Sequence, residues 1–196
     1  MTHPLVAKRQ GTDRRSIGRS EEVVRGVLAD PQQFRPVFDA MLGPDLVVRM
    51  RAADAVEKIT RRRADLLRGL EDRVLTEVAA IDQQEVRWHV ARLLPRLALT
   101  PPQRARAITI LRGFAGDDSR IVRTFAMQAL ADLAEHDEQM RRRVRPLLAE
   151  LTRTGTPAMR SRGRQLLARL EQPGLSRPPA GGTGGGMIQA GEDAAQ

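Results

Sequence analysis

The fold is decided by the segment SRIVRTFAMQALADL at residues 119–133, because similar segments occur three more times along the chain. The other copies begin at Val48 (VRMRAADAVEKI), Val86 (VRWHVARLLPRL) and Met159 (MRSRGRQLLARL). Together with Val122, their first residues lie 38, 36 and 37 positions apart. A period of roughly 20–50 residues is typical of a solenoid, in which each unit buries its apolar side only by stacking on the next.

Apolar residues recur within each copy at helical spacing. When the leading Val or Met is counted as position 0, positions 0, 4, 7, 8 and 11 of the 119–133 copy are Val122, Ala126, Ala129, Leu130 and Leu133. This stripe follows one side of a helix with 3.6 residues per turn, which we call helix B. A second apolar helical pattern, helix A, precedes each copy, and turn signals such as residues 43–45 and 100–103 separate the two. Pro36, Pro95 and Pro146 fall inside predicted helices and are expected to bend or end them.

These patterns predict an all-α fold, a right-handed α-α superhelix of about four helical hairpins plus one N-terminal helix that begins near Ser20. The solenoid is expected to span residues 20–171. Residues 1–19 are basic and without periodicity, and they are expected to form a disordered arm. Residues 172–196 are rich in Gly and Pro and are expected to form a disordered tail.

The repeated motif Asp-x-x-Val-Arg-x-x-Ala-x-x-Ala-Leu-x-x-Leu resembles the HEAT repeat, most clearly over residues 45–59 and 119–133. The resemblance covers four units over about residues 31–171, and the chain as a whole is similar to small bacterial HEAT-repeat proteins. It implies an armadillo-like scaffold or adaptor that binds other proteins and is not an enzyme.

An arginine stands at position 1 of every copy, at Arg49, Arg87, Arg123 and Arg160. In three copies the turn before helix B carries an acid, at Asp45, Asp82 and Asp117 or Asp118. Each arginine can therefore bond to an acidic turn within or between repeats, and HEAT-like arrays are expected to use such a structural ladder. The regular spacing favours this role over a row of phosphate-binding cations, with Arg160 as the least engaged member.

Some positions of helix B lie off the apolar stripe and are predicted to line the concave wall of the solenoid. Trp88 lies in the middle of this wall beside Arg92, a composition expected of a binding hot spot. Trp88 can equally pack between repeats and fill volume, and the sequence leaves both roles open. The candidate partner-binding residues are Met50, Arg51, Asp54, Trp88, Arg92, Gln128 and Arg162.

The formal charge of +9 favours an acidic segment of another protein as the partner. Nucleic acid is the alternative, because clustered cations bind phosphates, although only 3% of the residues are aromatic and can stack on bases. The alternative protein would resemble, in architecture, the alkyl-base DNA glycosylases built from HEAT-like repeats. Its cationic surface would consist of Arg51, Arg62, Arg92, Arg142 and Arg162.

Residues that carry out catalysis or bind metals are scarce in this chain. Cysteine is absent and the three histidines, His3, His89 and His136, are widely separated, so we expect no metal site, no cofactor and no catalytic residues. The absence of cysteine suits a cytoplasmic protein, and no apolar stretch is long enough to span a membrane. The expected function is that of a non-enzymatic cytoplasmic adaptor whose oligomeric state is open.

Overall fold

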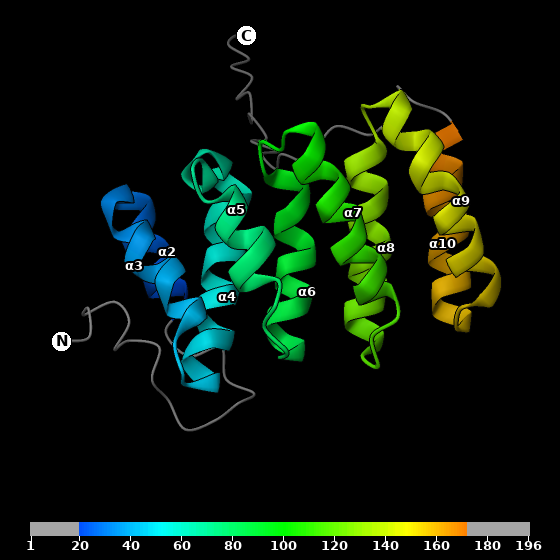
Figure 1. Cartoon of the computed structure of the whole chain (residues 1–196). Coiled ribbons are helices and arrows are strands. Elements are labelled where there is room, and N and C mark those ends of the chain that lie inside the picture. Colours follow the sequence, from blue (N-terminus) through cyan, green and yellow to red (C-terminus); the bar gives the residue numbers. More distant parts are fainter. Residues whose placement is uncertain (1–19, 172–196) are drawn as a thin grey trace, which may run out of the picture.

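The computed structural model describes residues 20–171, which contain helices and connecting turns and no strands. The helices form two layers (Figure 1). The B layer consists of α2 (Ser20–Ala29), α4 (Leu46–Arg62), α6 (Gln84–Leu93), α8 (Arg120–Ala134) and α10 (Pro157–Glu171). The A layer, in front in Figure 1, consists of α3 (Phe34–Asp39), α5 (Glu71–Arg73), α7 (Pro101–Ala115) and α9 (Glu138–Thr154).

Short helical turns flank these helices, at η1 (Pro31–Gln33), η2 (Ala40–Leu42), η3 (Ala64–Leu67), η4 (Val74–Val78) and η5 (Leu94–Arg96). Each A-layer segment pairs with the following B-layer helix, which gives four hairpins, and α2 adds one more helix at the N-terminal end of the B layer (Figure 1). The predicted all-α solenoid is therefore confirmed. None of the helices over residues 20–171 is long and apolar enough to cross a membrane.

The repeated apolar stripe forms the interior between the layers. In α8, Val122, Ala126 and Leu130 are fully buried. Side-chain caps start α4 and α8: Asp45 Oδ1 accepts hydrogen bonds from the backbone N–H groups of Val47 and Val48, each at 2.8 Å, and Ser119 Oγ accepts one from the N–H of Val122 at 3.4 Å. The N-cap residue of α6, Gln83, makes no such bond with its side chain. The caps of α4 and α8 satisfy N–H groups that have no partner inside the helix, and so they fix where these two helices begin.

The second A-layer segment differs from a regular helix. Leu70, Val74 and Val78 are buried as their spacing predicts, but no single helix carries them: Leu70 comes just before the three-residue α5, and Val74 and Val78 lie in η4. Gly69 adopts a left-handed conformation with φ 75°, which ends η3, and η4 is a π-helical turn closed by a hydrogen bond of 3.0 Å from Ala79 N to Val74 O. The extra residue in the π turn keeps the apolar side chains facing inward after the break.

Close approach of the last two helices depends on Gly163 of α10. A Cβ atom at this position would collide with the side chain of Thr152 in α9 and lie 3.0 Å from Cε of Met127 in α8. Glycine therefore allows α10 to pack against α8 and α9 together.

Arg49 and Arg87 of the predicted arginine ladder contact the following unit. Arg87 forms ion pairs with Asp82 in its own turn at 2.9 Å and with Asp117 of the next unit at 2.7 Å. Arg49 donates instead to Gln83 of the next unit at 3.0 Å, because the carboxylate of Asp45 caps its helix.

The other two ladder arginines make fewer contacts. Arg160 donates to the Gly155 carbonyl at 3.2 Å. The buried Nε atom of Arg123 has no hydrogen-bond partner within residues 20–171.

A second ladder, which the sequence analysis did not identify, joins the starts and ends of the A-layer segments. Arg73 pairs with Asp39 at 2.7 Å, and Arg104 pairs with Asp137 at 2.7 Å. Between them, Gln103 donates to Asp72 at 2.8 Å. In both layers, polar contacts thus join residues that lie about one repeat apart in the sequence. These contacts hold neighbouring hairpins in a fixed register.

Candidate functional site

An aromatic and cationic cluster lies at the junction of α6 and α8 on the B layer. The rings of Trp88 and Phe125 stack with their centroids 5.5 Å apart and an interplanar angle of 24°. Arg92, one turn after Trp88, places its guanidinium 5.1 Å from the Phe125 ring centroid and 6.0 Å from that of Trp88. All three side chains are half-buried, so each is packed on one side and open to solvent on the other. Stacked rings beneath a guanidinium form a rigid surface that binds apolar and anionic groups together.

The carboxylate of Glu57 organises the cationic side of this cluster. Its side chain is 1% exposed and forms ion pairs with Arg61 and Arg96 at 2.7 Å each and with Arg92 at 3.1 Å. Burial alone would raise the pKa of Glu57, but the hydrogen bonds from Arg96 and Arg61 outweigh it, and the pKa is lowered. Glu57 is therefore a fixed anion shared by three guanidinium groups.

Of these three arginines, Arg92 has the most unused binding capacity. It makes no hydrogen bond within residues 20–171 beyond the long contact to Glu57, whereas Arg96 also donates to the Glu57 carbonyl at 2.9 Å and to Thr60 at 3.1 Å. Burial lowers the pKa of Arg92, although the group stays charged. Its remaining N–H groups can bind an anion from a partner.

A hollow of about 320 Å³ lies beside the cluster between α6 and α8. Its wall includes Arg92, Arg96, Phe125, Gln128 and Asp132. The hollow therefore contains guanidinium groups, an aromatic ring, a carboxamide and the carboxylate of Asp132, which pairs with Arg169 at 2.6 Å.

The structure brings several predicted residues to this surface and engages some of them elsewhere. Met50 is half-buried on α4, and Arg162 is exposed on α10. Asp54 accepts a hydrogen bond from Ser20 at 2.8 Å and pairs with Lys58 at 3.1 Å, so it joins α4 to α2. Gln128 donates to Asp132, one turn away on α8, at 2.7 Å.

Arg51 differs from the prediction, because it is buried and only 2% exposed. It occupies position 3 of helix B, and the residues at position 3 in the next two units are His89 and Phe125. Phe125 packs on Trp88 of the preceding helix, so position 3 faces the neighbouring helix and not the open surface. Arg51 is therefore removed from the set of partner-binding candidates.

His89 is likewise enclosed. It is 2% exposed, and its Nδ1 atom has no hydrogen-bond partner within residues 20–171. Burial lowers the pKa of His89 to about 3, so its ring is neutral at physiological pH. Over residues 20–171, no group of three or more His, Asp or Glu side chains could hold a metal ion.

Glu57 and Arg96 belong to the site although neither was predicted from the sequence. The signal was present, because opposite charges recur about one repeat apart on helix B: Glu57 pairs with Arg96, and Asp132 pairs with Arg169 at 2.6 Å. Opposite charges separated by about one repeat therefore mark both pairs in the sequence.

Known proteins resemble this chain in structure and not in sequence. The sequence matches no protein-family model and no curated protein. The structure is similar to that of computationally designed armadillo repeat proteins for modular peptide recognition, with a TM-score of 0.62 and 16% identity over 85% of this chain and 80% of that one.

It is also similar to a designed armadillo repeat protein in complex with the peptide (KR)4, with a TM-score of 0.61 and 15% identity over 85% of this chain and 80% of that one. The fold is thus that of an armadillo-like α-solenoid.

Proposed function

We propose that this armadillo-like scaffold is a non-enzymatic adaptor that binds an extended acidic segment of another protein across α4, α6 and α8. The observation that carries the proposal is the half-buried stack of Trp88 and Phe125 beside the guanidinium of Arg92. Aromatic and arginine side chains are the residues most enriched in binding hot spots. The cytoplasmic location expected from the absence of cysteine is part of the same proposal.

The charge of the partner follows from the arginine cluster. Three guanidinium groups share the single carboxylate of Glu57, which leaves an excess of positive charge next to the aromatic stack. A designed protein of the same fold binds a peptide of alternating Lys and Arg. The arginine excess here favours a peptide of the opposite sign, with carboxylates for Arg92 and apolar side chains for the Trp88–Phe125 stack.

The length of the bound segment follows from helix spacing. Neighbouring packed helices lie about 8–10 Å apart, so the axes of α4 and α8 are separated by roughly 20 Å. An extended chain advances about 3.3 Å per residue, and about six residues cover that distance. A short linear segment is therefore sufficient to contact the whole cluster.

The same geometry supports a binding role over base-excision chemistry. Glu57 is the carboxylate paired with Arg92 next to Trp88, and its hydrogen bonds with arginines disfavour proton uptake. The five arginines of the alternative nucleic-acid surface also do not form one exposed surface, because Arg51 is buried.

The test measures binding of fluorescein-labelled peptides about ten residues long, whose Asp and Glu content varies at constant Leu and Phe content. We expect acidic peptides to bind best and Trp88→Ala to weaken their binding by roughly 30-fold, about 2 kcal/mol. Arg92→Ala should weaken binding to acidic peptides and leave neutral ones unaffected. Trp88 is the only tryptophan, so its emission reports directly on whether the peptide reaches the stack.

Arg112→Ala is the matched control, because Arg112 is exposed on α7 and its side chain forms no ion pair or hydrogen bond within residues 20–171. It removes the same charge as Arg92→Ala from the opposite layer, and we expect unchanged affinity. Equal losses in the two variants would mean that net charge alone attracts the peptide, and preferential binding of basic peptides would contradict the proposal.

A further inference from the structure

Positive charge is distributed unevenly along the solenoid. Residues 20–137 contain 18 basic and 18 acidic side chains, whereas residues 138–171, the α9–α10 hairpin, contain nine arginines and three glutamates. All the excess charge of the described chain therefore lies on its last hairpin. Such an excess opposes compact folding by self-repulsion unless an anion binds to it.

Several of these arginines lie on the face where a fifth hairpin would stack, which we call the terminal face. In α8, Met127 occupies position 5 of helix B and packs towards α10, as its proximity to Gly163 shows. The corresponding residues of α4 and α6, Ala53 and Ala91, are also buried. In α10 the same position is Arg164, which is exposed.

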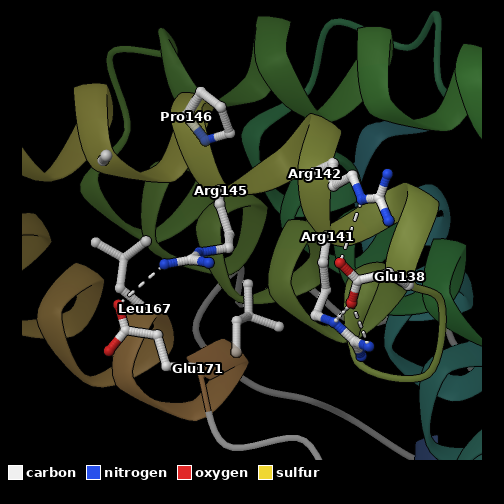
Figure 2. A pocket seen from close by; sticks show the side chains of 9 residues that line it. Glu138, Arg141, Arg142, Arg145, Pro146, Leu167 and Glu171 are labelled. Atoms are coloured by element: carbon white, nitrogen blue, oxygen red, sulfur yellow. Dashed lines mark hydrogen bonds and ion pairs between the residues drawn. The ribbon is translucent and has the colours of Figure 1, made fainter.

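The terminal face consists of one row of arginines on each helix. Arg142, Arg145 and Arg153 follow one side of α9 at spacings of three and eight residues, and Arg160 and Arg164 follow one side of α10 at a spacing of four. The α9 row borders a hollow of about 640 Å³, with Arg142 and Arg145 on one wall and the α10 residues Leu167 and Glu171 on the other. Arg153, Arg160 and Arg164 lie outside this hollow. Figure 2 shows Arg142 directed towards Glu138, and Arg145 directed towards Glu171.

Carboxylates neutralise only part of this surface. Arg142 and Arg145 pair with Glu138 and Glu171, at 3.3 and 3.0 Å, and the Arg142 side chain is still 77% exposed. Arg153 and Arg164 make no ion pair or side-chain hydrogen bond within residues 20–171, and both are exposed. The terminal face therefore presents guanidinium groups with free N–H donors on two packed helices.

The chemistry of the surface favours phosphates over a protein partner. Residues 138–171 contain no aromatic residue, and the exposed large apolar residues of the described chain, Leu46 and Ile121, lie on other helices. Protein interfaces depend on apolar and aromatic anchors, and single-strand binders depend on stacking, so neither fits. Guanidinium forks without such anchors suit the phosphodiester backbone of a duplex.

We propose that the terminal face of α9 and α10 binds the phosphate backbone of double-stranded DNA without reading its sequence. The α9 row from Arg142 to Arg153 is about 16 Å long at 1.5 Å per residue. A duplex carries one charge per about 1.7 Å, so roughly ten phosphate charges lie along that length. This site is separate from the peptide surface around Trp88, and the two can be occupied together.

The experiment measures binding of the full chain to a labelled duplex of about 20 base pairs at several salt concentrations. The test variant is Arg153→Ala with Arg164→Ala, because these two side chains have no partner whose loss would unfold the hairpin. We expect its affinity to fall roughly tenfold or more near 0.1 M salt and its slope of log affinity against log salt to become shallower by about 2. Circular dichroism checks that the helices persist.

The matched control is Arg112→Ala with Arg120→Ala, which removes the same net charge from exposed arginines of α7 and α8. We expect it to bind DNA like the unmodified chain, and equal losses in both double variants would overturn the proposal. Unchanged DNA affinity in both double variants would also overturn it. A third contrary result is that polyglutamate binds more tightly than DNA and that its binding depends on Arg153 and Arg164 in the same way. Emission of Trp88 should stay constant on DNA addition, which separates this result from the peptide test.

Discussion

Trp88 and His89 are neighbours in sequence whose side chains have different surroundings. Their rings stack with centroids 3.4 Å apart, yet Trp88 is half-buried and open to the B-layer surface, whereas His89 is enclosed by helices. The enclosed imidazole supports the orientation of the indole from below. Its protonation state therefore matters for stability and for the shape of the binding surface.

Stability should decrease as pH falls below about 6.5, because the buried His89 ring resists protonation. Its folded pKa of about 3 lies below the ordinary value of 6.5, so in that window the unfolded chain binds a proton that the folded chain does not. The contribution of the neutral His89 ring to the free energy of unfolding is complete above about pH 6.5 and is lost as pH falls towards the folded pKa. Urea unfolding should show a loss of about 2 kcal/mol between pH 6.5 and about pH 5.

The control for this prediction is His89→Leu, which removes the titrating group and keeps an apolar side chain of similar size. Its stability should be nearly constant over the same window. Glu57 does not interfere, because its folded pKa is lowered from 4.5 and its contribution is lost only below that value. An unchanged slope in His89→Leu would place the pH dependence in another group.

At the level of elements, the packing of α10 depends on one missing methyl group. Gly163→Ala should destabilise the last hairpin by about 1–3 kcal/mol, because the added Cβ collides with Thr152 and forces α10 away from α9. Thermal or urea unfolding measures the loss. Adding Thr152→Ala should recover part of it, since it removes the atoms that the new methyl group meets.

Gly113→Ala provides a control of opposite sign. A Cβ at Gly113 in α7 would have no atom within 4 Å, so alanine there should stabilise the helix by up to about 1 kcal/mol through its helix propensity. A loss of stability in Gly113→Ala as large as that in Gly163→Ala would mean that backbone effects outweigh the collision.

The B helices were predictable from the sequence because the apolar stripe and the repeat period agree at each of them, and a side-chain cap also marks the start of α4 and α8. The effect of the prolines on these helices could be predicted only in part. Pro95 follows the end of α6 and lies in a 3-10 turn, as expected, but α9 continues through Pro146. Pro146 is exposed, so water can hydrate the carbonyl that it leaves without a donor. The exposure of Pro146 depends on how the neighbouring helices pack, and the sequence around the proline does not contain that information.

The candidate site was predictable in part for the same reason. Helical spacing placed Trp88 and Arg92 on the surface of α6, one turn apart. It did not reveal that Phe125 comes from the next helix or that Glu57 comes from the preceding one, because those contacts depend on how neighbouring repeats align. Arg51 was misplaced by the same missing information, since its burial depends on the helices beside it.

At the level of the whole molecule, stability should be highest in the middle of the array. Within residues 20–171, α6 has a B-layer neighbour on each side, α4 and α8, whereas the B-layer neighbour of α10 is α8. In a linear array each unit is stabilised by its own contacts and by those of its nearest neighbours. Hydrogen exchange should therefore be slowest in α6 and faster in α10.

Mass spectrometry of peptic fragments resolves this gradient, and Gly163→Ala should increase exchange in α9 and α10 before it affects α6. Uniform exchange across all the helices would instead indicate a single cooperative unit.

The arginine at the position-5 site of α10 also limits how such a chain can grow by duplication. A duplicated hairpin inserted between two internal units meets a small or apolar position-5 residue, such as Ala53, Ala91 or Met127, on the unit before it. One appended after α10 meets Arg164, whose charge would have to be buried in the new contact. The number of repeats can therefore increase from within the array, but not at its C-terminal end unless Arg164 is replaced first.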